Sequence, residues 1–326
     1  MNMLLLPPDQ VTPKNRFPVV LQLLVLTLIL VITFGSLWWF SPTRDTGTDV
    51  RPMVNLTEIP TRPIGKEISN ISIQATAAYV WDVRGQRALY QKNEQAALPI
   101  ASITKLMTAL VTHELITDRT DVILPAVAIK QDGDSGLLPG EILTINQLNQ
   151  LALVSSSNDA AFALANAAGA LLGDRAPVSQ FVSAMNIRAD ELQLPSLTFY
   201  NTTGLDENTT VPGGIGSAKD VSFLLEYIIT RYPEIIDITQ VPITRVYNSD
   251  GVFHDAENTN PVIDRIPNLL ASKTGYTDLA GGNLTVAFNL GFDRPIIITV
   301  LGSTRDARFS DVLTLVEAVQ ASLLTE

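Results

Sequence analysis

The sequence predicts an α+β domain whose antiparallel sheet is formed by both ends of the domain, with a helical part inserted between them and one transmembrane helix in front. Three observations lead to this prediction. Strand patterns appear near residue 75 and return only after residue 269, helical patterns fill the interval, and an uncharged apolar run lies close to the N-terminus. Strands separated in this way pair most simply in one sheet beside a separate helical layer.

The composition is that of a folded, acidic protein. The 326 residues are 46% apolar and 17% charged, so a sizeable core is expected and disorder is not. The formal net charge of -11 repels phosphate backbones, which argues against nucleic acid as a partner. The absence of cysteine excludes a thiol nucleophile, a cysteine-bound zinc site and a disulfide framework.

The first element is the apolar run from Val19 to Phe40. It carries no charged side chain and is long enough to span a bilayer core of about 30 Å as a helix. Lys14 and Arg16 precede it and favour an N-terminus inside the cell, while Trp38 closes it in the manner of an interfacial aromatic. A cleaved signal peptide is the alternative, but its apolar region would be shorter and no Ala-x-Ala-like site follows.

This run divides the chain into four parts. We expect residues 1–18 to form a cytoplasmic tail and residues 19–40 a single-pass anchor in the cell membrane. Residues 41–70 are rich in proline and lack apolar periodicity, so they are expected to form an extended linker. Residues 71–326 are then expected to fold as one domain outside the membrane.

The sheet is expected from strands at both ends of this domain, the first two joined by a tight turn at Arg84-Gly85. The expected strands are Ala75–Asp82, Gln86–Gln91, one starting near Leu269, Asn283–Leu290 and Arg294–Leu301. A final helix is expected from Asp306 to Leu323.

Helical patterning runs between these strands, from Ser102 to Tyr232. Two sites resemble a capping box that opens a helix, in which a hydroxyl and a side chain three residues later each accept a backbone N–H. These sites are Thr144 with Gln147 and Ser217 with Asp220.

Only two histidines exist, and neither is placed to serve a catalytic serine on the expected helices. His113 lies on the same expected helix as Ser102 but about 16 Å further along its axis. His254 lies in a polar, asparagine-rich stretch and is expected to be a solvated loop residue. A Ser-His-Asp triad is therefore disfavoured, and without an HExxH sequence we expect no metal and no cofactor.

Ser102 and Lys105 form the first candidate motif for chemistry. They follow the extended residues Pro99-Ile100-Ala101 at the start of an expected helix, Ser102–Leu115. Positions i and i+3 share a helix face, so the amine of Lys105 can reach the hydroxyl of Ser102. A lysine acts as a base only when neutral, and burial or a neighbouring cation lowers its pKa. Taken alone, this pattern is also that of an ordinary helix start.

Two further stretches carry hydroxyl, amide and amine groups. Residues 151–154 lead into Ser155–Ala161, which is typical of a helix end, a serine-rich turn and a new helix, and is also an ordinary N-cap. Residues 269–272 lead as a strand into Lys273–Thr277, where glycine lets a substrate backbone approach an edge. A surface lysine before a turn is the plain alternative. Each stretch alone has an ordinary explanation, but all three in this order do not.

Together the three stretches resemble the S-x-x-K, S-x-N and K-T-G motifs of serine penicillin-recognising proteins. Within that group the chain is similar to the low-molecular-mass penicillin-binding proteins, the D-alanyl-D-alanine carboxypeptidase family. The resemblance implies a β-lactamase or DD-peptidase-like fold and runs from about Ile71 to the C-terminus. It includes LPIASITKLMTALV, LLPGEILTINQL, SSSNDAAFALA, MNIRADELQLPSLTFYNTTGLD, NTNPVIDRIPNLLASKTGYTDLAGGNL and VLGSTRDARFSD.

The resemblance implies catalytic roles for three residues. Ser102 would attack the carbonyl of the penultimate D-alanine in a peptidoglycan stem peptide that ends in D-Ala-D-Ala. Lys105 would take the proton of Ser102, and Ser156 would pass a proton toward the leaving amine. β-Lactam antibiotics would acylate the same serine.

The resemblance also implies how substrate would be held. Asn158 would bind the substrate amide and hold the base, and Lys273 and Thr274 would bind the terminal carboxylate beside Gly275. The backbone N–H groups of the nucleophile and of Tyr276 would form the oxyanion hole.

Three other functions compete with a carboxypeptidase. A DD-endopeptidase acting on peptidoglycan cross-links would use the same residues. A serine β-lactamase needs a deacylating glutamate in an E-x-x-L-N loop, and Glu191 begins such a match, but Pro195 replaces the asparagine and Glu191 is expected to be solvated. A non-catalytic wall-binding protein is expected to have a degenerate site, whereas every motif residue is present. Many family members also carry a second β-rich domain and a C-terminal anchor, which this sequence is not expected to have.

Overall fold

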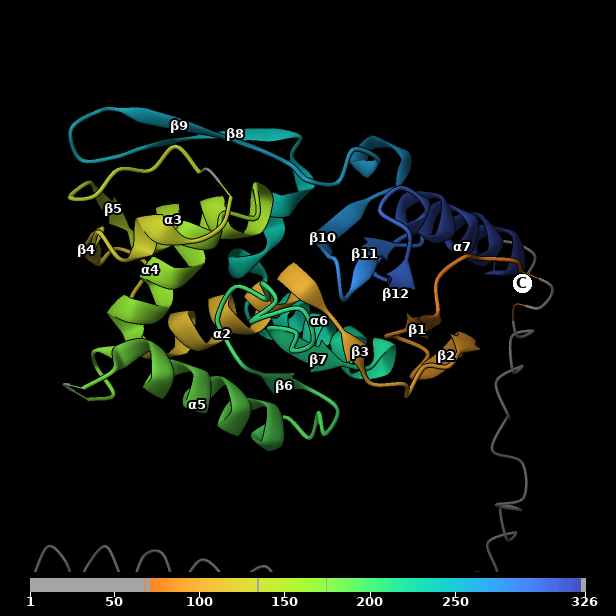
Figure 1. Ribbon diagram of the computed structural model, residues 1–326. Helices are drawn as coiled ribbons and strands as arrows, with labels where there is room; N and C mark the ends of the chain where they lie inside the picture. Colours follow the sequence, from red (N-terminus) through yellow and green to blue (C-terminus); the bar gives the residue numbers. More distant parts are fainter. Residues whose placement is uncertain (1–67, 69–70, 134, 174, 324–326) are drawn as a thin grey trace, which may run out of the picture. The chain divides into compact units, whose positions relative to one another are not determined.

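The computed structural model describes residues 68, 71–133, 135–173 and 175–323. At its centre is a five-stranded antiparallel sheet with the strand order β10-β11-β12-β1-β2 (Figure 1). Its strands are β1 (Ala77–Asp82), β2 (Arg87–Lys92), β10 (Leu269–Thr277), β11 (Gly281–Asn289) and β12 (Pro295–Ser303). The pairing of β1 with β12 joins the two ends of the domain, which confirms the predicted sheet.

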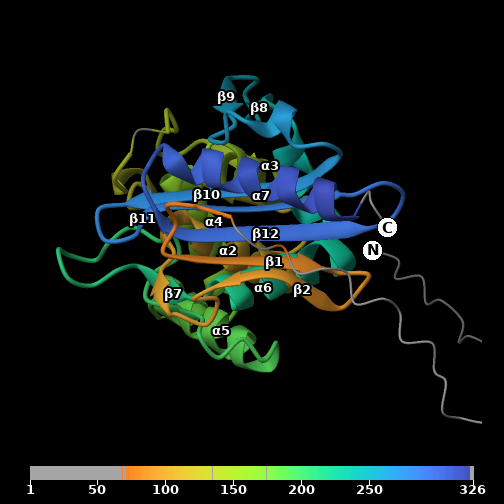
Figure 2. The ribbon, with the colours of Figure 1, turned by 90° about the vertical axis from the view of Figure 1, so that its right-hand side faces the viewer.

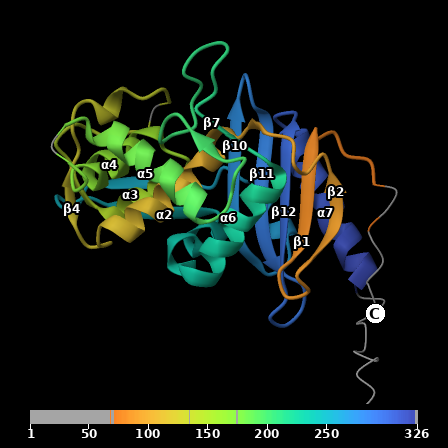
Figure 3. The ribbon, with the colours of Figure 1, turned by 90° about the horizontal axis from the view of Figure 1, so that it is seen from below.

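Successive side chains of the sheet enter two different cores, as the two-residue period of a strand requires. Tyr79 lies in the core on the helical side, which includes α2 (Lys105–Leu115) and α6 (Ala218–Arg231), whereas Val80 lies in the core under α7 (Ala307–Leu323). Figures 2 and 3 show α7 on one face of the sheet and α6 on the other. The helical side also carries Ser102, just before α2, and Lys105, the first residue of α2.

The inserted helical part has a core of its own. It includes α3 (Ile145–Val154) and α4 (Asn158–Gly169), and α5 (Pro177–Glu191) packs against α4. The predicted capping box at Thr144 and Gln147 is confirmed in both directions. At Ser217 only half of the predicted box forms, because Ser217 accepts the N–H of Asp220 while the Asp220 carboxylate accepts the N–H of Ser196 instead.

Short elements connect these layers and were not predicted individually, because two to five residues are too few to show a clear period. They are β3 (Leu98–Pro99), β4 (Asp121–Ile123), β5 (Ile142–Thr144), β6 (Thr198–Phe199), β7 (Gly214–Gly216), β8 (Ile243–Tyr247), β9 (Phe253–Glu257) and the 3₁₀ turns η1 (Ala101–Thr104), η2 (Ala128–Lys130), η3 (Pro233–Ile235), η4 (Asp237–Gln240) and η5 (Ile263–Arg265).

Two sequence predictions are wrong in detail. The expected helix Ser102–Leu115 begins as the 3₁₀ turn η1 and becomes α-helical only at Lys105. His254 is not a solvated loop residue: it lies in β9, its side chain is 9% exposed, and its Nε2 is 3.0 Å from Glu141 Oε2 as an ion-pair contact rather than a formed hydrogen bond. The β8–β9 hairpin packs on α3, which removes His254 from water.

The predicted anchor at residues 19–40 lies outside the described residues. Within the described part of the chain, no helix has the length and apolar character needed to cross a bilayer. Ile68, which falls in the predicted linker, donates its N–H to the carbonyl of Leu89 on β2 and packs against the core under α7. At least this residue of the expected linker therefore contacts the domain.

Candidate active site

A tight turn presents Ser102 between the sheet and the helical part. Ala101 precedes it with φ of 47°, a left-handed conformation that costs a residue with a side chain roughly 1 kcal/mol or more. Gly204, itself at φ +81°, comes so close that a Cβ there would lie 2.0 Å from the carbonyl oxygen of Ala101. The strained turn is thus supported by a segment that only glycine can supply.

Lys105 is fully buried at the end of this turn and has three polar neighbours. Its Nζ donates to Asn158 Oδ1 at 2.7 Å and to the backbone oxygen of Thr203 at 2.8 Å, and it lies 2.9 Å from Ser102 Oγ. The first two atoms can only accept. A neutral amine has two N–H bonds and one lone pair, so its lone pair is left to accept the O–H of Ser102.

Burial also favours the neutral form of Lys105. Desolvation lowers the pKa of Lys105 well below its ordinary value, and the charge of Lys273 lowers it further. No carboxylate stands among the causes of this shift. Of the two causes expected from the sequence, burial and a neighbouring cation, burial is the larger one. The site therefore holds a lysine that is prepared to act as a base.

The serine-rich turn between α3 and α4 supplies the second motif. Ser157 caps α4 by accepting the N–H of Ala160, and Ser156 stands before it with φ of 61°. Asn158 follows on the first turn of α4, where its Nδ2 donates to the backbone oxygen of Asp132 at 2.6 Å. Because that oxygen can only accept, the amide orientation is fixed and Oδ1 faces Lys105.

Lys273 comes from β10, the edge strand of the sheet next to the helical part. Its Nζ donates to Ser156 Oγ at 2.9 Å and to the backbone oxygen of Thr274 at 3.2 Å, and its side chain is buried. Burial, and after it the charge of Arg308, lowers the pKa of Lys273 to about 7.

The edge of β10 runs directly past the nucleophile. A Cβ on Gly275 would lie 2.7 Å from the oxygen of Ile100 and 3.2 Å from the backbone nitrogen of Ser102, so glycine is required for this approach. Thr274 is buried and shares a hydrogen bond with Thr259, while Tyr276 is 42% exposed. An extended peptide can approach this edge as an added strand.

The structure brings all the sequence-predicted site residues to one place, although their roles remain predictions. Two functional contacts were missed. The oxygen of Thr203 accepts from Lys105, and Arg308, which donates to the carbonyl of Gly275 at 2.6 Å, faces the K-T-G strand from α7. Both lie in stretches that resemble the family, but a backbone oxygen has no sequence signature and Arg308 follows its strand by more than thirty residues.

The residues weighed as alternatives lie elsewhere. His113 contacts Asp118 and Glu234, and Glu191 is 57% exposed in an ion pair with Arg188. The predicted solvated Glu191 is therefore confirmed. Among the residues that the structure describes, no cluster of three or more histidine or acidic side chains could hold a metal ion.

A serine beside a buried lysine, under a glycine-containing edge strand, is the arrangement of a serine acyl-transfer site. The model of a family described as D-alanyl-D-alanine carboxypeptidase, peptidase family S11, matches residues 64–305. The chain belongs to this family.

Some relatives that are similar to the chain are named carboxypeptidases, and others are named endopeptidases. The D-alanyl-D-alanine carboxypeptidase DacF of Bacillus subtilis is 29% identical over 260 residues, which are 78% of this chain and 64% of that protein. A D-alanyl-D-alanine endopeptidase of Pseudomonas aeruginosa is 30% identical over 247 residues, 73% of each chain. The chain thus spans somewhat less than two thirds of DacF.

Solved structures share the fold. Penicillin-binding protein D2 from Listeria monocytogenes, in its ampicillin-bound form, is 28% identical with a TM-score of 0.63, covering 77% of this chain and 98% of that one. A D-alanyl-D-alanine carboxypeptidase from Mycobacterium tuberculosis, at 24% identity, has a TM-score of 0.69 and covers 80% of this chain and 96% of that one. The second likeness concerns the fold alone.

Proposed function

We propose that this chain is a serine-type D-alanyl-D-alanine carboxypeptidase that removes the terminal D-alanine from peptidoglycan stem pentapeptides. The observation that carries the proposal is the environment of Lys105. Two acceptor-only oxygens hold its N–H groups and its lone pair is left for Ser102 Oγ at 2.9 Å. Membership of the family and the names of its relatives support the same activity.

Acylation begins when Lys105 accepts the proton of Ser102 and the serine oxygen attacks the carbonyl carbon of the penultimate D-alanine. The resulting oxyanion is stabilised by backbone N–H groups at Ser102 and Tyr276. The C–N bond then breaks, and the leaving D-alanine amine takes up the proton, relayed from Lys105 through Ser156. Water hydrolyses the ester and returns the proton to Ser102.

Substrate orientation depends on the edge of β10. The terminal carboxylate pairs with Lys273, whose charge it stabilises, and accepts the hydroxyl of Thr274. The peptide backbone lies along the edge beside Gly275, where no side chain blocks it. This carboxylate requirement selects a peptide that ends shortly after the scissile bond.

A DD-endopeptidase is the second candidate, since a relative with that name matches the chain as well as the carboxypeptidases do. A β-lactamase is disfavoured because Glu191 pairs with Arg188 at the surface rather than facing Ser102 or Lys105. β-Lactams are expected to acylate Ser102 and remain bound, and the similar Listeria protein has been solved in an ampicillin-bound form.

We also propose that residues 19–40 anchor the chain in the cell membrane, with the domain on the outer side. The uncharged run and the preceding basic residues support this location. Chain fractionated from cells should resist extraction by carbonate and dissolve in detergent. Recovery of mature chain that lacks residues 1–40 would instead identify a cleaved signal.

The test of activity is to incubate the full chain in detergent with a pentapeptide that ends in D-Ala-D-Ala and follow it by mass spectrometry. Loss of one D-alanine is expected, together with a penicillin adduct on the peptide that contains Ser102. Ser102→Ala should abolish both. Cleavage of a cross-linked dimer in preference to the pentapeptide would favour the endopeptidase.

A further inference from the structure

Glu226 lies outside the active site, on the side of α6 that faces β1. Its carboxylate is partly buried, and its two oxygens accept hydrogen bonds from Trp81 Nε1 at 2.9 Å and from Gln86 Nε2 at 3.3 Å. Both donors are neutral, and no ion pair joins Glu226 to another described residue. Burial raises the pKa of Glu226, as expected for a carboxylate withdrawn from water without a cation.

A hollow of about 390 Å³ opens beside this carboxylate. Its walls include Trp81, Phe223 and Leu192, and the rings of Trp81 and Phe223 meet edge to face with their centroids 5.2 Å apart. The hollow thus offers aromatic and aliphatic walls around one carboxylate. That combination suits a cation carried on an apolar stem.

Two basic side chains contact the walls of the hollow, and neither pairs with Glu226. Arg188 donates to the hydroxyl of Tyr227 but forms its ion pairs with two other glutamates. Lys219 lies over the ring of Phe223 at 5.7 Å, yet it stands two helical turns before Glu226, roughly 10 Å away along the axis. The rings therefore accept cations while the carboxylate is left without one.

The strand register places the hollow on the same face of the sheet as the active site. Trp81 is opposite Ile297, Ile297 is opposite Ala287, and Ala287 is opposite Ala271. Ala271 precedes Lys273 by two residues, so their side chains share a face. Three strand spacings separate Trp81 from Ala271, a distance of about 14 Å.

We propose that the hollow beside Glu226, the Glu226 pocket, binds the free side-chain ammonium of the diamino acid in the stem peptide of a neighbouring peptidoglycan strand. This rests on the proposed function and adds a second contact with the cell wall while another stem peptide occupies the active site. Charge complementarity selects the occupant, because the ammonium pairs with Glu226 while its methylene stem lies against Trp81. A cross-linked stem peptide carries an amide at that nitrogen, so the pocket distinguishes free strands from cross-linked ones.

The experiment uses the full chain in detergent with Trp38→Phe and Trp39→Phe, which leaves Trp81 as the reporter among the three tryptophans. The probe is the tripeptide L-Ala-γ-D-Glu-L-Lys, which lacks D-alanine. Titration should change the Trp81 fluorescence in a saturable way. Glu226→Gln, which keeps the shape and removes the charge, should weaken binding at least tenfold, whereas Glu317→Gln on the exposed side of α7 should not.

Acetylation of the lysine side chain of the tripeptide should weaken binding to the unaltered pocket by a similar factor. Equal binding of the free and acetylated tripeptides would overturn the proposal, whether or not Glu226→Gln folds. Equally tight binding of Gly-Lys-Gly would assign the pocket to a basic protein segment instead. Penicillin acylation of the same preparation tests the active site separately. If the chain binds the tripeptide but is not acylated, the proposed function is refuted while the binding role of the Glu226 pocket is retained.

Discussion

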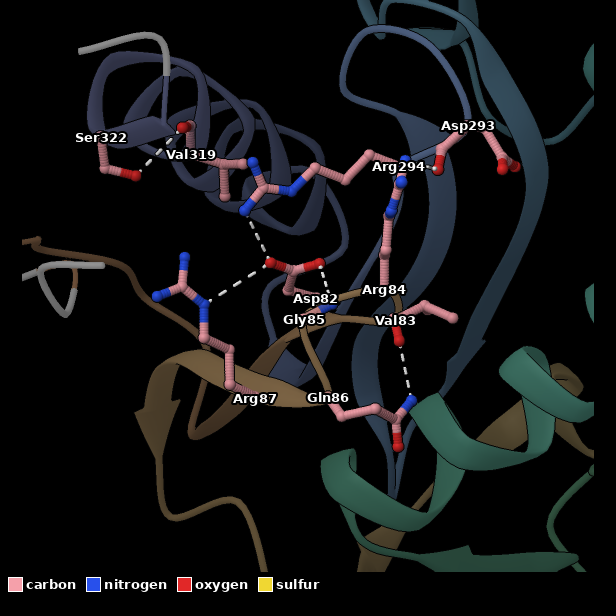
Figure 4. Close-up of polar contacts among 10 residues, drawn as sticks. All are labelled: Asp82, Val83, Arg84, Gly85, Gln86, Arg87, Asp293, Arg294, Val319 and Ser322. Carbon is pink, nitrogen blue, oxygen red and sulfur yellow. Dashed lines mark hydrogen bonds and ion pairs between the residues drawn. The ribbon is translucent and has the colours of Figure 1, made fainter. Parts of the chain in front are cut away.

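Two regions of this molecule bury charged groups, and they treat them in opposite ways. Asp82, at the end of β1, has a fully buried carboxylate that meets Arg294 at 2.8 Å, Arg87 at 3.5 Å and the N–H of Gly85 at 2.9 Å (Figure 4). In the active site, Lys105 and Lys273 are equally buried but are held by neutral oxygens.

The pKa values follow from this difference. Burial alone would raise the pKa of Asp82, but the hydrogen bonds from Arg294 and Gly85 and the charges of Arg294 and Arg87 outweigh it and lower the value. The two lysines have no such compensation, so burial lowers their pKa values. Partners of opposite charge therefore keep the buried Asp82 ionised. Lys105 and Lys273 are buried without such partners, so their pKa values fall toward the range in which a lysine can exchange a proton.

The largest expected effect comes from placing a permanent positive charge in the active site, where the buried lysines have no carboxylate partner. Lys105→Arg should lower the rate of penicillin acylation at least about a hundredfold, because a guanidinium stays protonated and cannot take the proton of Ser102. Stopped-flow acylation measures the loss, with Ser102→Ala as the reference and circular dichroism as the folding control. A variant that retains more than a hundredth of the rate would show that another group is the base.

The next largest effect should be a loss of stability when the Asp82 ion cluster is broken. Asp82→Asn leaves Arg294 and Arg87 without their shared carboxylate and should lower the free energy of unfolding by about 2–3 kcal/mol. Urea denaturation followed by circular dichroism measures this, and Asp293→Asn at the exposed neighbouring turn is the matched control. Equal stability of the two variants would mean that the Asp82 contacts do not offset its burial.

Removing a buried lysine that has no carboxylate partner should instead raise the free energy of unfolding. Lys273→Met is expected to stabilise the fold by roughly 1–3 kcal/mol at pH 7 while abolishing activity. The pKa of Lys273 is about 7 in the folded state and 10.5 ordinarily, so the unfolded chain binds the proton more tightly. Keeping Lys273 charged in the folded state lowers the stability of the wild type by the full amount below pH 7, and this loss disappears toward pH 10.5. The melting temperatures of the wild type and of Lys273→Met should therefore converge between pH 7 and pH 10.5. A constant difference would contradict this account.

The smallest effect concerns the pH dependence of substrate binding. Because the pKa of Lys273 is about 7, its carboxylate-binding form declines above pH 7, and kcat/KM should fall there through a rising KM. Lys273→Arg keeps its charge and should move this limb to higher pH. Steady-state kinetics on the pentapeptide from pH 6 to 9 gives the comparison. A limb that stays near pH 7 in the variant would assign it to another group.

The sheet could be predicted because its signals are local. Short apolar runs form β1 and β12, and four of the predicted strands match the observed ones to within about two residues at each end, whereas β10 continues past the predicted residue 272 to Thr277. The turn at Arg84-Gly85 was also predictable, and glycine is needed there because a Cβ would lie 2.4 Å from Asp82 Oδ2. The ion cluster around Asp82 could not be predicted, because Arg294 comes from the far end of the domain.

The candidate site divides in the same way. The contact between Ser102 and Lys105 spans three residues, so spacing alone predicts it, even though the turn proved to be 3₁₀ rather than α-helical. The oxygen of Thr203 comes from 98 residues beyond Lys105, and Ser156 lies 117 residues before Lys273. No local pattern reports such contacts.

The sequence by itself therefore determined which groups are available: a serine and a lysine at helical spacing, a serine-rich turn, a strand with Lys273, and no cysteine or well-placed histidine. Only the tertiary structure decided their protonation. A pKa depends on burial and on the charges within a few ångströms, and these come from segments that are distant in the chain. The same lysines at the surface would be ordinary cations, and it is the packing of η1 against β10 and of α2 against α4 that buries them and lowers their pKa values.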